Sequence, residues 1–390
     1  MGHAGLVTGT FALQLPPRIL FGEGTADAVP DAVAALGERI LIVTGSDPRR
    51  FGDLIDAVAE AGSGSAVVPV AGEPTVDDAR TATEAGHRIG AEAVVGIGGG
   101  SVLDLAKAAA MLLGNGGDPL DYLEVIGSGA PITRAALPLV ALPTTAGTGS
   151  EVTANAVLAA PDHRVKASLR SPLMLPRMAV VDPVLTLACP PAVTASSGMD
   201  ALTQCLEPYV SNRANPVTDG WARTGLQAAG RGLRRAFTDG ADHVARTEMA
   251  LASLMGGLAL ANAKLGAVHG FAAVIGGMTD APHGAICAAL LAPVYRANIA
   301  HATGAVAARY TDAARWLTGD PQASALDGLR WIEHTREQFA IPPLSQYGLG
   351  PGETAEIVAK AARASSMQGN PVRLGDEVLA EIYLAAVERA

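Results

Sequence analysis

The feature that most constrains the fold is an alternation of β-branched runs and helical stretches in the first half of the chain. Strands are expected at residues 39–45, 65–70, 93–97 and 138–143, with helices at 53–62 and 76–90. Short loops between alternating strands and helices are typical of βαβ units, whose strands lie parallel in one sheet. The sequence therefore predicts an α/β domain with a parallel sheet.

The second half of the chain has a different pattern. Beyond a proline-rich stretch at 182–191 it is rich in alanine and leucine, with helical periodicity throughout. A length of 390 residues also exceeds what one hydrophobic core usually fills. We therefore expect an α/β domain at 1–185 and an all-helical domain at 186–390.

Composition excludes several classes of function. The net charge of −10 argues against a nucleic-acid binder, which needs a basic face. Three cysteines are too few for a disulfide framework, which favours a reducing compartment. We expect no signal peptide and no membrane span, since no apolar stretch reaches the required length of about 20 residues. The prediction is a cytoplasmic protein whose 49% apolar residues suit a homodimer or larger homo-oligomer.

Two loops rich in small residues follow consecutive expected strands. The first, GIGGGSVLDLAK at 96–107, leaves backbone N–H groups open at a helix start, where partial positive charge attracts phosphate. Ser101 is expected to cap that helix in a box with Asp104. The second, PTTAGTGSEVT at 143–153, offers hydroxyl groups without bulk. Two such loops at the carboxyl ends of parallel strands favour a cofactor site over ordinary turns.

Together with GMDALTQCLE at 198–207, VHG at 268–270 and PHG at 282–284, these loops resemble the iron-containing (group III) alcohol dehydrogenase family. That family shares its fold with glycerol dehydrogenases and dehydroquinate synthases. The resemblance spans nearly the whole chain and implies a helical metal-binding domain, with a cleft between it and the nucleotide-binding domain. It also implies an NAD(P)-dependent alcohol dehydrogenase or aldehyde reductase, which transfers hydride between nicotinamide and a small alcohol or carbonyl compound.

The resemblance also implies which residues meet the cofactor and substrate. The loop residues carried over as cofactor-binding are Gly99, Gly100, Ser101, Asp104, Thr144, Thr145 and Thr148. Lys166 and Asn155 fall where the family has residues near the cofactor and the substrate, respectively. Phe271 is a candidate for an apolar wall of the substrate site, although a helical core also needs such side chains.

The choice between NADP and NAD is argued from the end of the first expected strand. Relatives that prefer NAD usually have an acidic residue there, which bonds the ribose 2′-hydroxyl, whereas this strand ends on Gly45. Without that carboxylate a 2′-phosphate is not repelled, and Arg49 and Arg50 follow closely enough to pair with it. We expect NADP, with NAD and merely solvated arginines as the alternative.

The family holds a divalent metal with one aspartate and three histidines. Asp200, His269 and His283 match that pattern and are the expected catalytic and metal-binding residues. Gln204, one helical turn after Asp200, replaces the remaining histidine. Its amide oxygen is a poorer donor than imidazole, yet three good ligands suffice for a catalytic site. We expect Fe²⁺ first and Zn²⁺ second, with Gln204 as a weak ligand.

Three other positions leave alternatives open. Cys287 follows His283 by four residues and offers a thiolate, but core packing is the expected role for it and for Cys205. Ala273 stands where several relatives carry a further histidine, so the proton is expected to pass to water or ribose hydroxyls. The alternatives are a metal-independent enzyme resembling maleylacetate reductases, a lyase resembling dehydroquinate synthase, and a non-catalytic cofactor-binding protein.

Overall fold

The structure, a computed structural model, describes residues 10–163 and 165–388. Its contacts divide the chain into two compact units. The first, here called the helical unit, contains the described residues of Met1–Gln14, Ala146–Thr148 and Cys189–Ala390. The second, here called the α/β unit, contains the described residues of Leu15–Thr145 and Gly149–Ala188.

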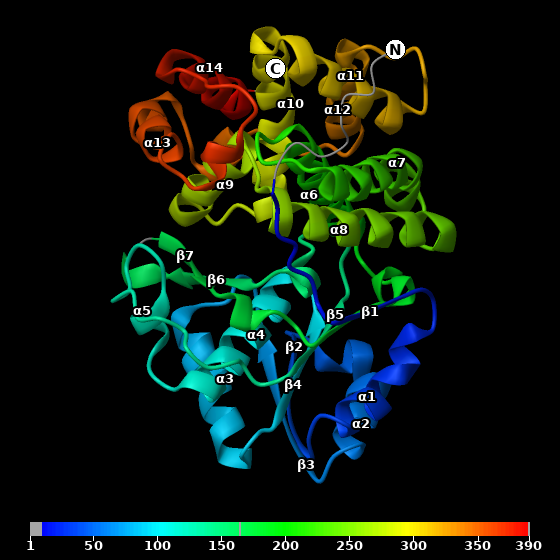
Figure 1. Ribbon diagram of the computed structural model, residues 1–390, viewed down its shortest axis with the longest axis vertical. Coiled ribbons are helices and arrows are strands. Elements are labelled where there is room, and N and C mark those ends of the chain that lie inside the picture. Colours follow the sequence, from blue (N-terminus) through cyan, green and yellow to red (C-terminus); the bar gives the residue numbers. More distant parts are fainter. Residues whose placement is uncertain (1–9, 164, 389–390) are drawn as a thin grey trace. The chain divides into compact units, whose positions relative to one another are not determined.

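A six-stranded sheet forms the centre of the α/β unit (Figure 1), with the strand order β1-β8-β5-β4-β2-β3 and every pair parallel. Its strands are β1 Arg18–Phe21, β2 Arg39–Gly45, β3 Gly64–Val70, β4 Ala93–Gly98, β5 Leu139–Pro143 and β8 Met178–Val181. The predicted parallel sheet is confirmed, and its four expected strands are β2 to β5. The sequence analysis missed β1 and β8 because a strand of four residues is too short to show a periodic pattern.

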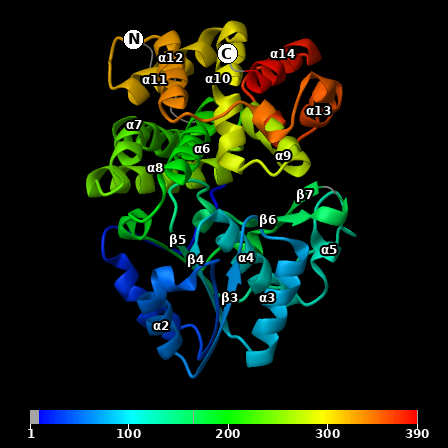
Figure 2. The same cartoon turned by 180° about the vertical axis from the view of Figure 1, so that it is seen from behind.

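Helices cover both faces of this sheet (Figures 1 and 2). They are α1 Val29–Ala34, α2 Gly52–Glu60, α3 Val76–Ile89, α4 Gly100–Asn115 and the one-turn α5 Pro119–Tyr122. Alternate residues of β2 point to opposite faces: Ile40 and Ile42 pack with α1 and α2, whereas Leu41 and Val43 pack with α3 and α4. Since both faces are covered, the strands are continuous apolar runs.

An antiparallel hairpin, β6 Asn155–Ala160 and β7 Val165–Arg170, lies outside the main sheet and was not predicted. It packs against α4, where the Val157 N–H donates a hydrogen bond to Asp104 Oδ2 at 2.9 Å. The hairpin therefore fixes the position of α4 next to the glycine-rich loop.

The described residues of the helical unit contain α-helices and short 3₁₀ turns and no strand, which confirms the all-helical prediction. The α-helices are α6 Pro191–Val210, α7 Pro216–Thr238, α8 His243–Ala263, α9 Ala267–Met278, α10 His283–His301, α11 Gly304–Thr318, α12 Ala325–Gln338, α13 Thr354–Ala361 and α14 Asp376–Val387. One hydrophobic core joins them, and it includes much of α6, whose residues are all buried from Gly198 to Val210.

Helix α8 is long and apolar enough to cross a membrane by length and composition alone, which the sequence analysis did not expect. The buried share of its most apolar window is 61%, as in a core helix. Gly256 allows α8 to approach α6 closely, since a Cβ at that position would lie 3.1 Å from the Cβ of Gln204. These contacts explain its apolar composition by packing within the helical unit.

Candidate functional site

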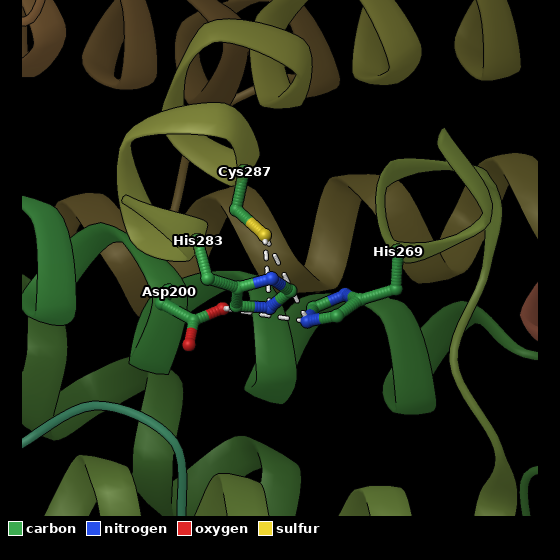
Figure 3. Close-up of side chains that lie close together, drawn as sticks. All are labelled: Asp200, His269, His283 and Cys287. Carbon is green, nitrogen blue, oxygen red and sulfur yellow. Dashed lines mark hydrogen bonds and ion pairs between the residues drawn. The ribbon is translucent and has the colours of Figure 1, made fainter. Parts of the chain in front are cut away.

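Four side chains of the helical unit converge from three helices (Figure 3). Asp200 comes from α6, His269 from the first turn of α9, and His283 and Cys287 from the first two turns of α10. One potential ligand atom of each lies within 4.8 Å of the others. Asp200, His269 and Cys287 are buried, whereas His283 is partly exposed. We call these four residues the metal cluster.

The break between α9 and α10 brings the two histidines together. Pro282 is the N-cap of α10, so His283 is the first residue of that helix. Helix α9 ends at Met278, so the chain turns between Met278 and His283. Without this break, His269 and His283 would lie on one continuous helix, several turns apart.

The atoms of the metal cluster face a common centre. Asp200 Oδ1 lies 3.3 Å from His269 Nε2 and 3.8 Å from His283 Nε2. Cys287 Sγ lies 3.6 Å from His283 Nε2 and 3.9 Å from His269 Nε2. Figure 3 shows the sulfur and the carboxylate oxygen directed toward both imidazole rings.

Electrostatics in the metal cluster favour positive charge. The charge of Cys287, followed by that of Asp200, raises the pKa of His283 to about 9 against the effect of burial. Burial lowers the pKa of His269, but Cys287, Asp200 and the nearby Glu207 together raise that pKa well above its ordinary value. Burial alone would raise the pKa of Asp200, yet the two histidines lower it. A buried site that stabilises cations in this way suits a metal ion.

Asp200 supplies an independent indication of a metal. Its Oδ1 atom is buried and accepts no hydrogen bond from the described residues. A buried carboxylate oxygen without a partner is costly unless a cation occupies its lone pair. Since carboxylate, imidazole and thiolate are all ligands of zinc and iron, the residues present fit a divalent metal.

Gln204 makes a contact that differs from its expected role as a weak ligand. Its Nε2 donates a 2.8 Å hydrogen bond to Asp200 Oδ2. Because an ionised carboxylate only accepts, the amide must turn its nitrogen rather than its oxygen toward Asp200. Gln204 Oε1 is buried without a hydrogen-bond partner among the described residues. In this structure Gln204 orients Asp200.

Glu207 completes the surroundings of His269 and was missed by the sequence analysis. His269 Nδ1 and Glu207 Oε2 are 2.8 Å apart, and Glu207 Oε1 accepts the Val268 N–H at 2.7 Å. A carboxylate at Nδ1 keeps the proton on that nitrogen and leaves the Nε2 lone pair for the metal cluster. The signal was present in the sequence, since Glu207 follows Asp200 by two helical turns and so lies on the same face of α6.

The remaining predicted residues near the cluster have packing roles or no polar group. Phe271 is completely buried in the helical core, so it presents no surface to a substrate in this structure. Cys205 is a core residue as expected, with Sγ donating to the Ala252 carbonyl at 3.3 Å. Ala273 is exposed on α9 and offers no titratable group.

In the α/β unit, the two predicted loops lie at the carboxyl ends of the neighbouring strands β4 and β5. The Thr144 N–H donates to the Gly98 carbonyl at 3.0 Å and joins the loops. A Cβ at Gly98 would lie 2.4 Å from Val102 Cγ2, and one at Gly99 would lie 3.2 Å from Thr145 Oγ1. The tight turn therefore requires glycine at position 98 and leaves little space beside position 99.

The predicted capping box of Ser101 and Asp104 is wrong. Helix α4 begins at Gly100, its N-cap is Gly99, and no side chain caps it. Asp104 instead accepts hydrogen bonds from the Ser150 hydroxyl at 2.6 Å and from the Val157 N–H. The carboxylate is drawn toward the second loop and the hairpin, so the first-turn N–H groups of α4 stay available to an anion.

Gly45 ends β2 as predicted, and its surroundings are open. A Cβ built there would meet no atom within 4 Å, so packing does not require glycine at this position. Arg49 is highly exposed and forms a 2.8 Å ion pair with Asp47. Arg50 lies over the ring of Phe51 at 5.5 Å from its centroid.

Three other predicted residues are spread over the two units. Asn155 is half-buried at the start of β6. Lys166, in β7, has its Nζ 3.7 Å from Glu73 Oε1. Thr148 belongs to the segment Ala146–Thr148, which groups with the helical unit.

Comparisons with known proteins assign the whole chain. A family model described as iron-containing alcohol dehydrogenase matches residues 16–183, and a model of the C-terminal region of that family matches residues 194–387. Alcohol dehydrogenase 4 of Saccharomyces cerevisiae (strain YJM789) is 38% identical over 300 residues, covering 75% of this chain and 76% of the yeast protein. Choline dehydrogenase of Bacillus subtilis (strain 168) is 31% identical over 385 residues, covering 95% of this chain and 93% of that protein.

Solved structures agree with this assignment. A 1,3-propanediol oxidoreductase superposes with a TM-score of 0.89 at 31% identity, covering 96% of this chain and 99% of that one. Sulfoacetaldehyde reductase from Bifidobacterium kashiwanohense, solved in complex with NAD⁺, gives a TM-score of 0.87 at 29% identity, with 98% and 100% covered. The chain therefore belongs to the iron-containing alcohol dehydrogenase family and is an oxidoreductase that acts on CH–OH groups.

Proposed function

We propose that this protein is a nicotinamide-dependent alcohol dehydrogenase or aldehyde reductase with a divalent metal bound by Asp200, His269 and His283. One observation carries the proposal: in the metal cluster four ligand-type atoms lie within 4.8 Å of one another. The substrate is a small alcohol and its carbonyl partner. Relatives named for 1,3-propanediol, choline and 4-hydroxybutyrate support this substrate class.

The residues around the metal have separate tasks. A divalent metal bound here supplies Lewis-acid polarisation of a carbonyl or alcohol oxygen. His269 presents Nε2 because Glu207 holds its Nδ1. Gln204 holds Asp200 in place. For the metal we propose Fe²⁺ or Zn²⁺: the family points to iron, and the ligands present also suit zinc. With alanine at 273, the proton is exchanged with water or with ribose hydroxyls.

We propose NADP as the cofactor and NAD as the second choice, with the pyrophosphate at the open N-terminus of α4. Gly45 places no carboxylate where a 2′-phosphate would lie, and packing alone does not explain the glycine. The ion pair of Arg49 with Asp47 is exposed and therefore contributes little. A phosphate, which binds arginine through two hydrogen bonds, competes well for such a side chain.

The metal cluster also favours this proposal over a metal-independent reductase resembling maleylacetate reductases. Asp200 Oδ1 is buried and accepts no hydrogen bond from the described residues, which favours a bound cation beside it. A chain with only three cysteines, all of them buried, supports a reducing cytoplasm. The apolar composition supports a homodimer or larger homo-oligomer.

The test is metal analysis of anaerobically purified protein beside the Asp200→Ala variant, with NADPH and NADH turnover on short aldehydes. We expect about one equivalent of iron or zinc in the wild type, and loss of both metal and activity in the variant. Turnover by metal-free wild-type protein would show that the enzyme is metal-independent, like the maleylacetate reductases. A protein with neither metal nor turnover would contradict the proposed enzyme altogether.

A further inference from the structure

We propose that Cys287 is the fourth ligand of the metal and that the resulting Asp–His–His–Cys site binds zinc in preference to iron. The inference rests on the proposed function, because it assumes a metal in the cluster. It assigns to α10 the ligand position that Gln204 on α6 leaves vacant.

Cys287 is placed for this role by helix geometry. It lies one turn after His283 on α10, so both side chains leave the same face of that helix. Its sulfur lies within 4 Å of the Nε2 atoms of His269 and His283, at 3.9 and 3.6 Å. The side chain is completely buried. Figure 3 shows Sγ on the side of the two imidazoles, facing the centre that Asp200 also faces.

The interatomic distances match a tetrahedral site. Zinc bonds of about 2.0 Å to nitrogen and about 2.3 Å to sulfur place those two atoms about 3.6 Å apart in a tetrahedron. The two observed sulfur–nitrogen distances are 3.6 and 3.9 Å. The corresponding nitrogen–oxygen edge is about 3.4 Å, and the two observed distances from Asp200 Oδ1 are 3.3 and 3.8 Å. These four distances between ligand atoms are therefore close to the values expected when all the atoms bind one zinc ion.

Gln204 does not compete for this position. Its amide nitrogen is engaged by Asp200 Oδ2, which keeps the amide oxygen turned from that carboxylate. A neutral amide oxygen is also a weaker ligand for a transition metal than a thiolate. The residue that replaces the family's histidine thus orients Asp200, and the sulfur from α10 completes the ligand set.

Cys205 shows how a cysteine that serves only for packing differs from Cys287. Cys205, also fully buried, donates its S–H to the Ala252 carbonyl, and burial raises the pKa of its thiol. Cys287 faces two imidazole nitrogens and a carboxylate, which are partners of a metal ligand. Of the two, only Cys287 lies in a ligand cluster, and Cys205 is the matched control.

The ligand set determines metal preference. Thiolate with imidazole is a set that suits zinc, and zinc also stands above ferrous iron in the general order of affinity. Binding requires a thiolate and neutral imidazoles, so the protons that these groups hold without metal are released to solvent. We therefore expect zinc to displace iron from the wild-type site.

The experiment uses the full chain, stripped of metal by a chelator and loaded with Co²⁺. We expect about one equivalent of bound cobalt, visible bands of a tetrahedral site, and an intense near-ultraviolet band from sulfur-to-cobalt charge transfer. Cys287→Ser should lose the ultraviolet band and keep the visible bands. Cys205→Ser should keep both.

The possible outcomes separate this inference from the proposed function. Bound cobalt without the ultraviolet band in the wild type, or a band that survives Cys287→Ser, would overturn the sulfur ligand and leave the proposed function standing. Failure to bind cobalt, zinc or iron would overturn both. X-ray absorption of the zinc-loaded wild type needs no variant: it should show one sulfur at about 2.3 Å, and a shell of nitrogen and oxygen alone would contradict the proposal.

Metal preference is measured by anaerobic competition between Zn²⁺ and Fe²⁺ with a chelating indicator. Cys287→Ser should reduce zinc affinity by at least about tenfold, since loss of an outer-shell partner alone costs that much. Iron affinity should fall less. An equal loss for both metals would contradict the zinc preference.

Discussion

The metal cluster and the glycine-rich loop are built in different ways. The cluster consists of titratable side chains from three helices of the helical unit, of which Asp200, His269 and Cys287 are buried and His283 is partly exposed. The loop, in the α/β unit, offers backbone N–H groups and small side chains at the ends of β4 and β5. The cluster is therefore sensitive to the loss of a functional group, whereas the loop is sensitive to the gain of a single carbon atom.

Burial explains why the cluster needs supporting residues and the loop does not. Charged groups in a low-dielectric interior must be held by partners, and Gln204 and Glu207 perform this task for Asp200 and His269. Backbone N–H groups at a helix start are fixed by the helix itself. A buried carboxyl group without such partners should instead have a raised pKa, and the α/β unit contains one.

That carboxyl group belongs to Glu151, and replacement of this residue by glutamine gives the largest expected effect. Burial raises the pKa of Glu151 to about 7, while Lys107 opposes the rise. Because the folded-state pKa lies above the unfolded value, the stabilisation is present at acid pH and is lost as the pH rises through about 7. Between pH 5 and pH 8 the free energy of unfolding of the wild type should therefore fall by on the order of 2 kcal/mol relative to that of Glu151→Gln.

Urea unfolding of both proteins at the two pH values measures this difference. The surface variant Glu60→Gln, at an exposed position of α2, is the control in the same unit. If the difference in free energy of unfolding between wild type and Glu151→Gln were the same at both pH values, the raised pKa of Glu151 would be contradicted.

The second effect concerns the support of the metal cluster. Glu207→Gln keeps the shape but removes the charge that holds the proton on His269 Nδ1, so Nε2 is no longer reserved for the metal. Metal affinity should fall about 10- to 100-fold, measured by chelator competition, with NADPH binding unchanged. Glu248→Gln, which loses only an ion pair with Arg231, should behave as wild type. Normal metal affinity in Glu207→Gln would mean that packing alone orients His269.

The third effect tests the loop. Gly99→Val adds carbon where a Cβ would already lie 3.2 Å from Thr145 Oγ1. Overpacking by one small side chain costs 1–3 kcal/mol, so NADPH should bind about tenfold or more weakly. The metal content should be unchanged. Fluorescence titration of NADPH measures the loss, and Gly64→Val, whose Cβ would meet Arg39 at an ordinary 3.9 Å, is the control.

The smallest effect concerns cofactor preference. Gly45→Asp restores a carboxylate at an open position near the surface. Repulsion of about 1 kcal/mol against a 2′-phosphate should shift the preference from NADPH toward NADH by about fivefold. The ratio of kcat/KM values for the two cofactors measures it, and Gly45→Ala should leave it unchanged. An unaltered ratio in Gly45→Asp would place the 2′-phosphate elsewhere.

Much of the fold could be predicted because its signals are local. Continuous apolar runs such as Arg39–Gly45 are characteristic of strands covered on both faces. The short edge strand β1 and the central β8 lack such a run, and their pairing is a long-range contact. The position of β8 between β1 and β5 was therefore decided by packing.

The same distinction applies to the functional residues. The resemblance of their motifs to the family was sufficient to nominate Asp200, His269 and His283 as ligands. The role of Cys287 depends on how α10 approaches α9, and that of Gln204 on the direction in which its amide turns within α6; no spacing reveals either. Asp104 shows the converse: a correct local signal for a cap was overridden by hydrogen bonds to the second loop and the hairpin.

The sequence by itself determined the family, the sheet, the helical unit and three of the four residues proposed as ligands, because each of these is encoded in short motifs or periodic patterns. Only the tertiary structure decided that Cys287 meets the histidines, that Gln204 binds Asp200, and that Glu207 holds His269. The physical reason is that the contacts of Cys287 and of Glu207 with His269 join different helices. For Gln204, spacing shows that it shares a face of α6 with Asp200 but not that its amide turns to that carboxylate. The distances and burial of these contacts arise when the helices pack into one core.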